Sequence, residues 1–394
     1  MPSKIDRRRV LTGIAAAAAI GPMAGLSRTA VAQTDAVTVF ASGLTNPRGF
    51  AWADDGTMYI GLGGDGVVAE EAVASGEGGL NAEGTPEVTG ADVIYTGTLT
   101  ASVARIADGC PATLATGFPS GGVPELGWVF GLDDVVMFDG QLYGVVAGGG
   151  EAYGNPDFPN GVYQINADGS FVLVADTSAW VRENPVETPH DPVSPDAEPF
   201  SIIAGDGMLW LSEANHQQIM TVALDDTISR VVDLSVVGNV APTGIVLAPE
   251  GGVYVGFLSG LPFTDGSARV VHVSPEGEVT DVWTGLTAVT DIALDADGTL
   301  LALEMATGNM GEPPFVTAGT GKVVRQSGPD TADEVVTGLD FPVKMDFGAD
   351  GALYVATPAF GAMAGEGQVL RIDLGAEGPI AIEGPLEPSV SCQV

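Results

Sequence analysis

Residues 240–286 contain the unit that decides the fold, and they read VAPTGIVLAPEGGVYVGF, then a polar insertion, then ARVVHVSPEGEVTDVWTGL. Val, Ile, Tyr and Phe alternate with smaller or polar residues, which is the pattern of half-buried strands. Tight turns that contain Gly251 and Gly277 form the first and third connections. The stretch therefore predicts four short strands joined by three connections.

Copies of this unit recur along the chain, beginning near Asn46, Gly131, Pro199, Val240, Thr290 and Phe341. The sixth copy has only three strands, and a spare strand, Val37–Leu44, precedes the first copy. Pairing the spare strand with the last copy would close a ring and remove its exposed edges. We therefore predict an all-β fold, a six-bladed β-propeller over residues 37–374 whose N-terminal strand completes the last blade. Residues 375–394 form a C-terminal tail.

An aromatic column runs through the repeats at equivalent positions, namely Tyr59, Tyr143, Trp210, Tyr254 and Tyr354. A column this uniform is typical of packing between blades.

The N-terminal 32 residues have the composition of a targeting segment. Arg7-Arg8-Arg9-Val10-Leu11 precedes an Ala-rich apolar run, and Ala30-Val31-Ala32 resembles a cleavage site. The arginine pattern fits a twin-arginine signal, with an ordinary secretory signal as the alternative. No other apolar run is long enough to span a bilayer. We expect an exported protein that is periplasmic, attached to the cell surface or extracellular.

Charge excludes two classes of partner. The 394-residue chain has 14 Lys and Arg against 51 Asp and Glu, a formal net charge of −37. Binding of nucleic acid depends on Lys and Arg at the phosphates, so neither nucleic acid nor an anionic membrane surface is an expected partner. The remaining candidates are a small molecule, a glycan or another exported protein.

Three stretches carry a resemblance to a known family: GLTNPRGFAWADDGTMYIG, APTGIVLAPEGGVYVGFLSGLPFTDGSARVVHV and TDIALDADGTLLALE. They resemble the ScyD/ScyE family of exported bacterial propeller proteins, and the units also resemble NHL-type repeats. The resemblance implies the propeller fold. The family's namesakes are associated with production of scytonemin, an extracellular pigment, and no catalytic motif accompanies it.

Strand order predicts where a ligand would bind. The connections between the second and third strands and the crossovers between blades share one face, and all the long insertions fall there: 63–97, 148–160, 258–267, 305–320 and the Pro-rich loop 183–199. Loops on a rigid scaffold commonly carry binding sites. We call this side of the ring the insertion face and place the candidate site on it, over the central channel.

Polar residues vary from blade to blade at the mouth of that channel. The positions at or near the start of the innermost strands and in the adjacent loop give a ligand-binding set of Arg48, Asp134, Ser201, Asn215, Thr243, Asp291 and Lys344. Glu213 and Glu304 end the second strands of their blades. Carboxylates around one axis suit Ca²⁺, so these two glutamates are candidate metal ligands. The alternative is a channel whose charges pair with one another.

Histidine supplies the one candidate for proton transfer. His216 follows Glu213 in a short connection on the insertion face, and an ordinary turn histidine is the alternative. His190 lies in the Pro-rich loop. A Gly-x-Ser-x-Gly nucleophile motif is absent from the sequence, so no catalytic set is assigned beyond His216.

The two cysteines, Cys110 and Cys392, are far apart in the sequence. Cys110 lies in a turn of the first blade, and the tail leaves the neighbouring sixth blade on the same side. A disulfide that holds the closed ring is one expectation, and a free thiol in a loose tail is the other.

These patterns favour an exported binding or accessory propeller of the ScyD/ScyE type. The alternative is an enzyme on the same ring, either a calcium-dependent lactonase or a quinoprotein sugar dehydrogenase. A purely structural protein of the cell surface is a third class. No cofactor is certain, and Ca²⁺ is the one that the acidic mouth suggests.

Overall fold

A computed structural model describes residues 36–66, 97–123, 128–189, 194–238, 240–260, 262–311, 315–359, 364–375, 378–388 and 392. The predicted signal segment, His190 and most of the first insertion, residues 67–96, lie outside the described residues. None of the described helices is long and apolar enough to cross a membrane.

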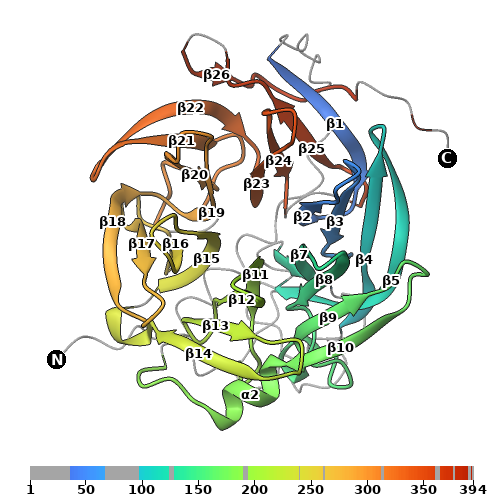
Figure 1. Cartoon of the computed structure of the whole chain (residues 1–394). Helices are drawn as coiled ribbons and strands as arrows, with labels where there is room; N and C mark the ends of the chain where they lie inside the picture. Colours follow the sequence, from blue (N-terminus) through green and yellow to red (C-terminus); the bar gives the residue numbers. More distant parts are fainter. Residues whose placement is uncertain are drawn as a thin grey trace, which may run out of the picture.

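Six sheets surround one axis, and the four strands of each blade pair antiparallel, which confirms the six-bladed propeller (Figure 1). Blade 1 contains β2 (Pro47–Trp52), β3 (Met58–Leu62), β4 (Thr98–Ala107) and β5 (Cys110–Val123). Blade 2 contains β7 (Leu132–Phe138), β8 (Gln141–Val146), β9 (Gly161–Ile165) and β10 (Phe171–Asp176). Blade 3 contains β11 (Pro199–Gly205), β12 (Met208–Glu213), β13 (Gln218–Val222) and β14 (Ile228–Asp233).

Blade 4 contains β15 (Val240–Leu247), β16 (Val253–Ser259), β17 (Ala268–Val273) and β18 (Val279–Leu286). Blade 5 contains β19 (Val289–Leu294), β20 (Leu300–Glu304), β21 (Gly321–Gly328) and β22 (Thr331–Leu339). Blade 6 contains β23 (Lys344–Phe347), β24 (Leu353–Thr357) and β25 (Gly367–Ile372). Its fourth strand comes from the other end of the chain.

That strand is β1 (Val37–Leu44), which pairs antiparallel with β25 from Val37 opposite Ile372 to Leu44 opposite Gly367. The predicted closure by the N-terminal strand is therefore confirmed. Val37, Val39, Ala41 and Leu44 are buried on β1, because its alternating apolar residues face the neighbouring blades. Closure thus buries apolar area as well as pairing an edge.

Hydrophobic clusters lie between neighbouring blades, and each contains side chains from two of them. The aromatic column follows this rule. Tyr59 packs in the cluster that contains Leu132 of blade 2, and Trp210 packs in the cluster that contains Ile245 of blade 4. Tyr354 of blade 6 packs edge-on against Trp52 of blade 1, with ring centroids 4.8 Å apart. These contacts confirm that the column serves packing between blades.

Several elements extend the four-stranded plan. The short strand β6 (Trp128–Phe130) pairs with the end of β5, and the helix α2 (Thr177–Glu183) follows β10. Two 3₁₀ turns, η3 (Glu151–Tyr153) and η4 (Ser235–Val237), lie in connections. The helix α2 was not predicted from the sequence, and it begins where the Asp176 carboxylate accepts a hydrogen bond from Ala179 N.

The C-terminal tail crosses the outside of three blades. Its strand β26 (Ile380–Ala381) pairs parallel with β22 of blade 5. Pro388 then forms a bridge with Val39 on β1 of blade 6. Finally Cys392 forms a disulfide with Cys110 at the start of β5, with Cα atoms 5.5 Å apart. The tail therefore reaches blade 1 after contacts with blades 5 and 6.

Candidate functional site

The starts of the innermost strands meet at the axis, where the structure brings three predicted site residues into direct contact. Lys344 Nζ lies 3.0 Å from Asp134 Oδ2 and 3.3 Å from Ser201 Oγ. Ser201 Oγ donates to the same Asp134 oxygen at 2.6 Å. The fourth member, Asp291, places Oδ1 at 3.8 Å from Lys344 Nζ. We call these four residues the axial cluster.

Asp134 and Asp291 occupy equivalent positions at the start of the innermost strands of blades 2 and 5. In the blade before each of them, the equivalent position is a glycine, Gly49 in blade 1 and Gly244 in blade 4. A Cβ on Gly49 would lie 1.8 Å from Asp134 Oδ1, and a Cβ on Gly244 would lie 2.6 Å from Asp291 Oδ1. Both glycines therefore leave the space that the carboxylates fill. Asp134 and Asp291 are each 1% exposed, so the axial cluster places buried charged side chains in contact with one another near the axis of the ring.

Burial sets the charge state of the axial cluster. Burial raises the pKa of Asp291 to about 7, although Lys344 and a hydrogen bond from Met345 N oppose the change. Burial would lower the pKa of Lys344, but Asp134 and Asp291 outweigh it and the pKa is raised. Lys344 is thus a permanent cation between two carboxylates, and Asp291 is the group that takes up a proton near neutral pH.

Arg48, predicted to face the acidic mouth, forms a buried pair with Asp133 of blade 2. Arg48 Nε and Nη2 donate to Asp133 Oδ1 and Oδ2 at 3.1 and 2.8 Å. The Arg48 guanidinium also lies over the Phe200 ring at 5.8 Å. These three residues occupy equivalent positions in blades 1, 2 and 3, each one residue before Gly49, Asp134 or Ser201. The pair joins two neighbouring blades with two parallel hydrogen bonds, the strong form of a charged contact.

Thr243 also joins neighbouring blades. Its Oγ1 donates to Val289 O of blade 5 at 2.7 Å and lies 3.1 Å from Gly256 O of its own blade. In the next blade Thr290 Oγ1 donates to Pro342 O at 3.1 Å. The threonine hydroxyls are used in the same way in two successive blades, which assigns Thr243 a place in the scaffold.

Glu213 is fully buried, and donors surround its two oxygens. Oε1 accepts from Glu198 N at 2.8 Å, and Oε2 accepts from His216 N at 3.0 Å and Gln218 Nε2 at 3.1 Å. His216 Nδ1 lies 3.3 Å from Oε1. Burial raises the pKa of Glu213, but the hydrogen bonds and charge of His216, Glu198 N and Gln218 outweigh it, so the pKa is lowered. Glu213 is an ionised carboxylate that holds a turn and a crossover together.

His216 is fixed by that carboxylate, and its side chain is 14% exposed. Burial lowers the pKa of His216, but the bond to Glu213 and the charges of Glu213, Glu198 and Asp196 outweigh it and raise the pKa. The imidazole therefore holds its proton to higher pH than a free histidine does. A protonated His216 suits proton donation better than proton abstraction.

Glu304 has different partners. Its Oε1 accepts from Thr287 N at 2.8 Å, and Oε2 lies 3.5 Å from Lys322 Nζ. Burial raises the pKa of Glu304 against the opposing effects of Lys322 and Thr287 N. Both predicted metal ligands thus contact the backbone of the crossover that precedes their own blade, and their contacts do not converge on one point.

Both oxygens of Glu213 already accept hydrogen bonds from the protein, so a Ca²⁺ ion bound there would have to share or displace these donors. Across the described stretches of the chain, no group of three or more His, Cys, Asp or Glu side chains is arranged to hold a metal ion. Asn215, the last of the predicted set, donates from Nδ2 to Ser194 O at 3.2 Å and Asp196 O at 2.9 Å. It anchors the loop between blades 2 and 3.

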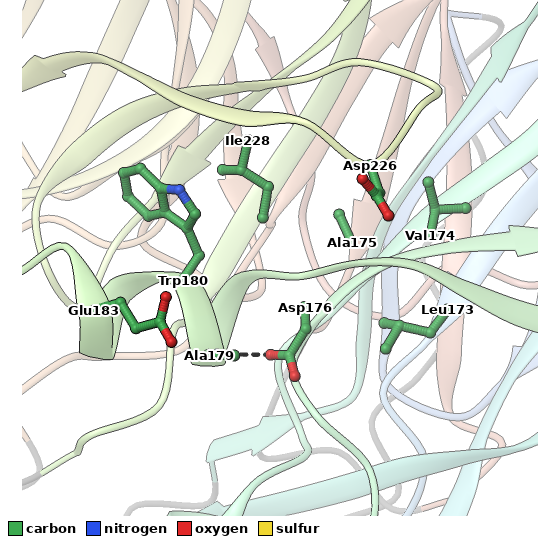
Figure 2. Close-up of a pocket in the computed structure, with 9 residues that line it drawn as sticks. All are labelled: Leu173, Val174, Ala175, Asp176, Ala179, Trp180, Glu183, Asp226 and Ile228. Atoms are coloured by element: carbon green, nitrogen blue, oxygen red, sulfur yellow. Dashed lines mark hydrogen bonds between the residues drawn. The ribbon is translucent and has the colours of Figure 1, made fainter.

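A cavity that the sequence analysis missed lies on the outer wall of the ring, between β10, α2 and the turn that joins β13 to β14 (Figure 2). Its volume is about 390 Å³, and Trp180 forms part of its wall. The available signal was Asp176 followed by Thr177 and Ser178, which is a helix start after a strand.

Comparisons with known proteins show the fold. No protein family matches the sequence, and no curated protein matches it. Solved propellers do match by structure. One is a PQQ-bound aldose sugar dehydrogenase of Streptomyces coelicolor, with a TM-score of 0.51 and 12% identity over 86% of this chain and 97% of that chain.

Two further structures are similar. A protein of Thermus thermophilus assigned as an oxidoreductase (glucose dehydrogenase) gives a TM-score of 0.53 at 14% identity, over 85% of this chain and 99% of its own. The calcium-binding protein regucalcin of Agrobacterium tumefaciens gives 0.49 at 13% identity, over 87% and 96%. At 12–14% identity, the similarity shows a shared propeller fold and nothing about activity.

Proposed function

We propose that this protein is an exported binding or accessory propeller of the ScyD/ScyE type that holds its ligand on the insertion face. The ligand would be a small molecule, a glycan or another exported protein. The observation that supports the proposal is the way in which the long connections on this face are tied to one another. A surface fixed before binding loses less entropy when a ligand arrives.

Side-chain amides make most of these ties. Asn155 Nδ2, in the β8–β9 connection, donates to Ser120 O of blade 1 at 3.1 Å and to Gly148 O at 2.8 Å. Asn309 Nδ2, in the β20–β21 connection, donates to Phe263 O in the connection of blade 4 at 2.9 Å. The Asp265 carboxylate accepts from Gly308 N at 2.8 Å. Three of these four bonds join neighbouring blades, so the described parts of these connections are held against one another.

The axial cluster supports the same proposal. Its charges are paired with one another, and a ligand that entered the channel would have to separate Lys344 from buried Asp134. A ligand would therefore contact the long connections rather than the axis. Export is supported by the disulfide, since such bonds persist outside the reducing cytoplasm.

The proposal is tested by a search for ligands that raise the thermal midpoint of the mature protein, using mono- and oligosaccharides, lactones and aromatic small molecules. A ligand at 100 times its Kd should stabilise the fold by about 2.7 kcal/mol. The effect should fall in Asn309→Ala, which loosens two connections. It should persist in Asn166→Ala, a matched change at an exposed turn on the opposite face. Equal effects in both variants would place the ligand elsewhere.

Calcium should leave the thermal midpoint of the protein unchanged. The oxygens of Glu213 already accept several hydrogen bonds, and Glu304 contacts Thr287 N and Lys322. The measurement compares the midpoint in EDTA with that in millimolar Ca²⁺. A rise in Ca²⁺ that disappears in a Glu213→Ala, Glu304→Ala double variant would contradict this expectation and favour a calcium-dependent lactonase.

An enzyme is the second candidate, and the pair formed by Glu213 and His216 favours it. A buried carboxylate that fixes an imidazole on the insertion face is an arrangement suited to proton transfer. Hydrolysis of lactones, or oxidation of aldoses with added quinone cofactor, would be the activity to assay. Activity that falls in His216→Gln and persists in His272→Gln would establish this candidate over the first.

The same pair makes a prediction about pH that is independent of any ligand. His216 has a folded pKa above its unfolded value, so its contribution to stability is present below about pH 6.5 and is lost as the pH rises through the folded pKa. Glu213 has a lowered pKa, so its contribution is lost as the pH falls through that value. His216→Gln should therefore lower the free energy of unfolding more at pH 5.5 than at pH 9, as urea titrations would show. An equal loss at both pH values would mean that the imidazole is not held as a cation.

A further inference from the structure

The cavity on the outer wall between blades 2 and 3 combines an apolar wall with three carboxylates. Leu173, Val174 and Ala175 of β10 form one side, and Ile228 of β14 lies across from them (Figure 2). Leu173 is 37% exposed, an apolar side chain at the surface beside a hollow. The volume of about 390 Å³ lies within the range of small-molecule sites, which are mostly apolar with a few placed polar groups.

The polar groups of this cavity are all acidic. Asp176, Glu183 and Asp226 line it from three different elements, namely the end of β10, the end of α2 and the β13–β14 turn. Asp176 uses Oδ1 to accept from Ala179 N at 2.7 Å. No side-chain hydrogen bond or ion pair joins Glu183 or Asp226 to another described residue. Their charges face the cavity without a neutralising partner of their own.

The aromatic wall is held in place by a cation. Arg230 lies over the Trp180 ring at 5.2 Å, and its Nε donates to Gln218 Oε1 at 2.7 Å. Arg230 also donates to Asn184 O, just after α2. These contacts fix the indole and place one positive charge near three negative ones. The cavity therefore keeps an excess of negative charge beside an ordered aromatic and aliphatic surface.

We infer that this cavity binds an amphiphilic cation, a small molecule with an aliphatic chain and a protonated amine. The chain would contact Leu173, Trp180 and Ile228, which removes apolar area from water. The ammonium would lie among Asp176, Glu183 and Asp226, whose combined negative charge attracts it at the solvent-exposed edge of the cavity. The site lies on the outer wall of the ring and shares only α2, with Glu183 at its end, with the connections of the insertion face, so its ligand is additional to the one proposed above.

Hexylammonium, hexanol and hexanoate test the inference, because they share one chain length and differ in charge. Isothermal titration of the mature protein, together with tryptophan fluorescence, should show that hexylammonium binds more tightly than hexanol and that hexanoate binds least. The double variant Glu183→Gln, Asp226→Asn keeps the shape of the cavity. It should weaken hexylammonium binding about tenfold, as expected for two partly solvated carboxylates, and leave hexanol binding unchanged.

The strongly acidic surface requires a control for general attraction of cations. Glu276→Gln, Asp297→Asn removes the same charge from exposed turns of blades 4 and 5 and should leave the affinity within about twofold at moderate salt. An equal loss in both double variants would overturn the inference, as would equal binding of hexanol and hexylammonium or the absence of heat with hexylammonium. A loss confined to the cavity variant would establish the site.

Discussion

Replacing Lys344 with methionine should lower the free energy of unfolding by about 3–5 kcal/mol, since it leaves two buried carboxylates without their cation. Asp134 Oδ2 would lose its 3.0 Å contact, and Asp291 its neighbour at 3.8 Å. The loss is large compared with the ~5–15 kcal/mol that holds a typical domain folded. Urea unfolding at pH 8, followed by tryptophan fluorescence, measures it.

The loss should also depend on pH. Asp134, Asp291 and Asp346 are the carboxylates whose charges act on Lys344. Burial already raises the pKa of Asp291 and Asp346, and without the lysine, which opposes that effect, both pKa values rise further. A group with a raised folded pKa binds more protons in the folded state, so stability falls as the pH increases. The methionine variant should therefore be closer to the parent at pH 5 than at pH 8.

Arg371→Met provides the matched control. It also removes one cation, but Arg371 pairs with Asp350 at the surface, where both side chains are more than 30% exposed. Such pairs contribute about 0–1 kcal/mol. Adding Asp291→Asn to the Lys344 variant should restore part of the stability by removing one uncompensated charge. Similar losses in the two single variants would mean that the axial cluster is more hydrated than its burial indicates.

Removing the disulfide should lower the free energy of unfolding by about 2–5 kcal/mol. The bond joins residues 282 positions apart, and cross-linking so long a loop removes much of the freedom of the unfolded chain. The Cys110→Ser, Cys392→Ser variant should also lose the contacts of the tail at β26 and Pro388 first, and become open to proteases after residue 375. Denaturant titration and limited proteolysis measure the two effects.

A chemical control separates the bond from the side chains. The parent protein in a strong reductant should match the double serine variant, and the variant should not respond to reductant. The exported protein should show no free thiol by intact mass after alkylation. Two alkylated cysteines would show that the bond does not form during export, and the double variant would then be as stable as the parent.

The sequence predicted the axial positions because equivalent positions in a repeat occupy equivalent places in a ring. Asp134, Ser201, Asp291 and Lys344 were aligned by register alone, and the structure brings them together. The aromatic column followed for the same reason. What register does not contain is the direction of each side chain, so the pairing of Arg48 with Asp133 was not foreseen.

Irregular backbone explains what the sequence did not predict. Glu213 and Glu304 occupy the same repeat position, but their carboxylates accept from Glu198 N and Thr287 N in crossovers whose course no periodicity determines. The outer cavity likewise depends on α2, a single short helix in one blade that has no counterpart in the repeat. A feature that occurs in only one blade cannot be found by aligning the repeats.

The closed ring determines when blade 6 and the disulfide can form during folding. Blade 6 takes its outer strand from residues 37–44 and its other three from residues 344–372, so it forms only when nearly the whole chain has been made. Cys110 and Cys392 meet only on that finished surface, since the tail reaches blade 1 across β22 and β1. The disulfide therefore forms only in completely assembled molecules. A truncated or misassembled copy would keep free thiol and an unpaired strand edge, and that chemical difference alone would distinguish it from finished copies.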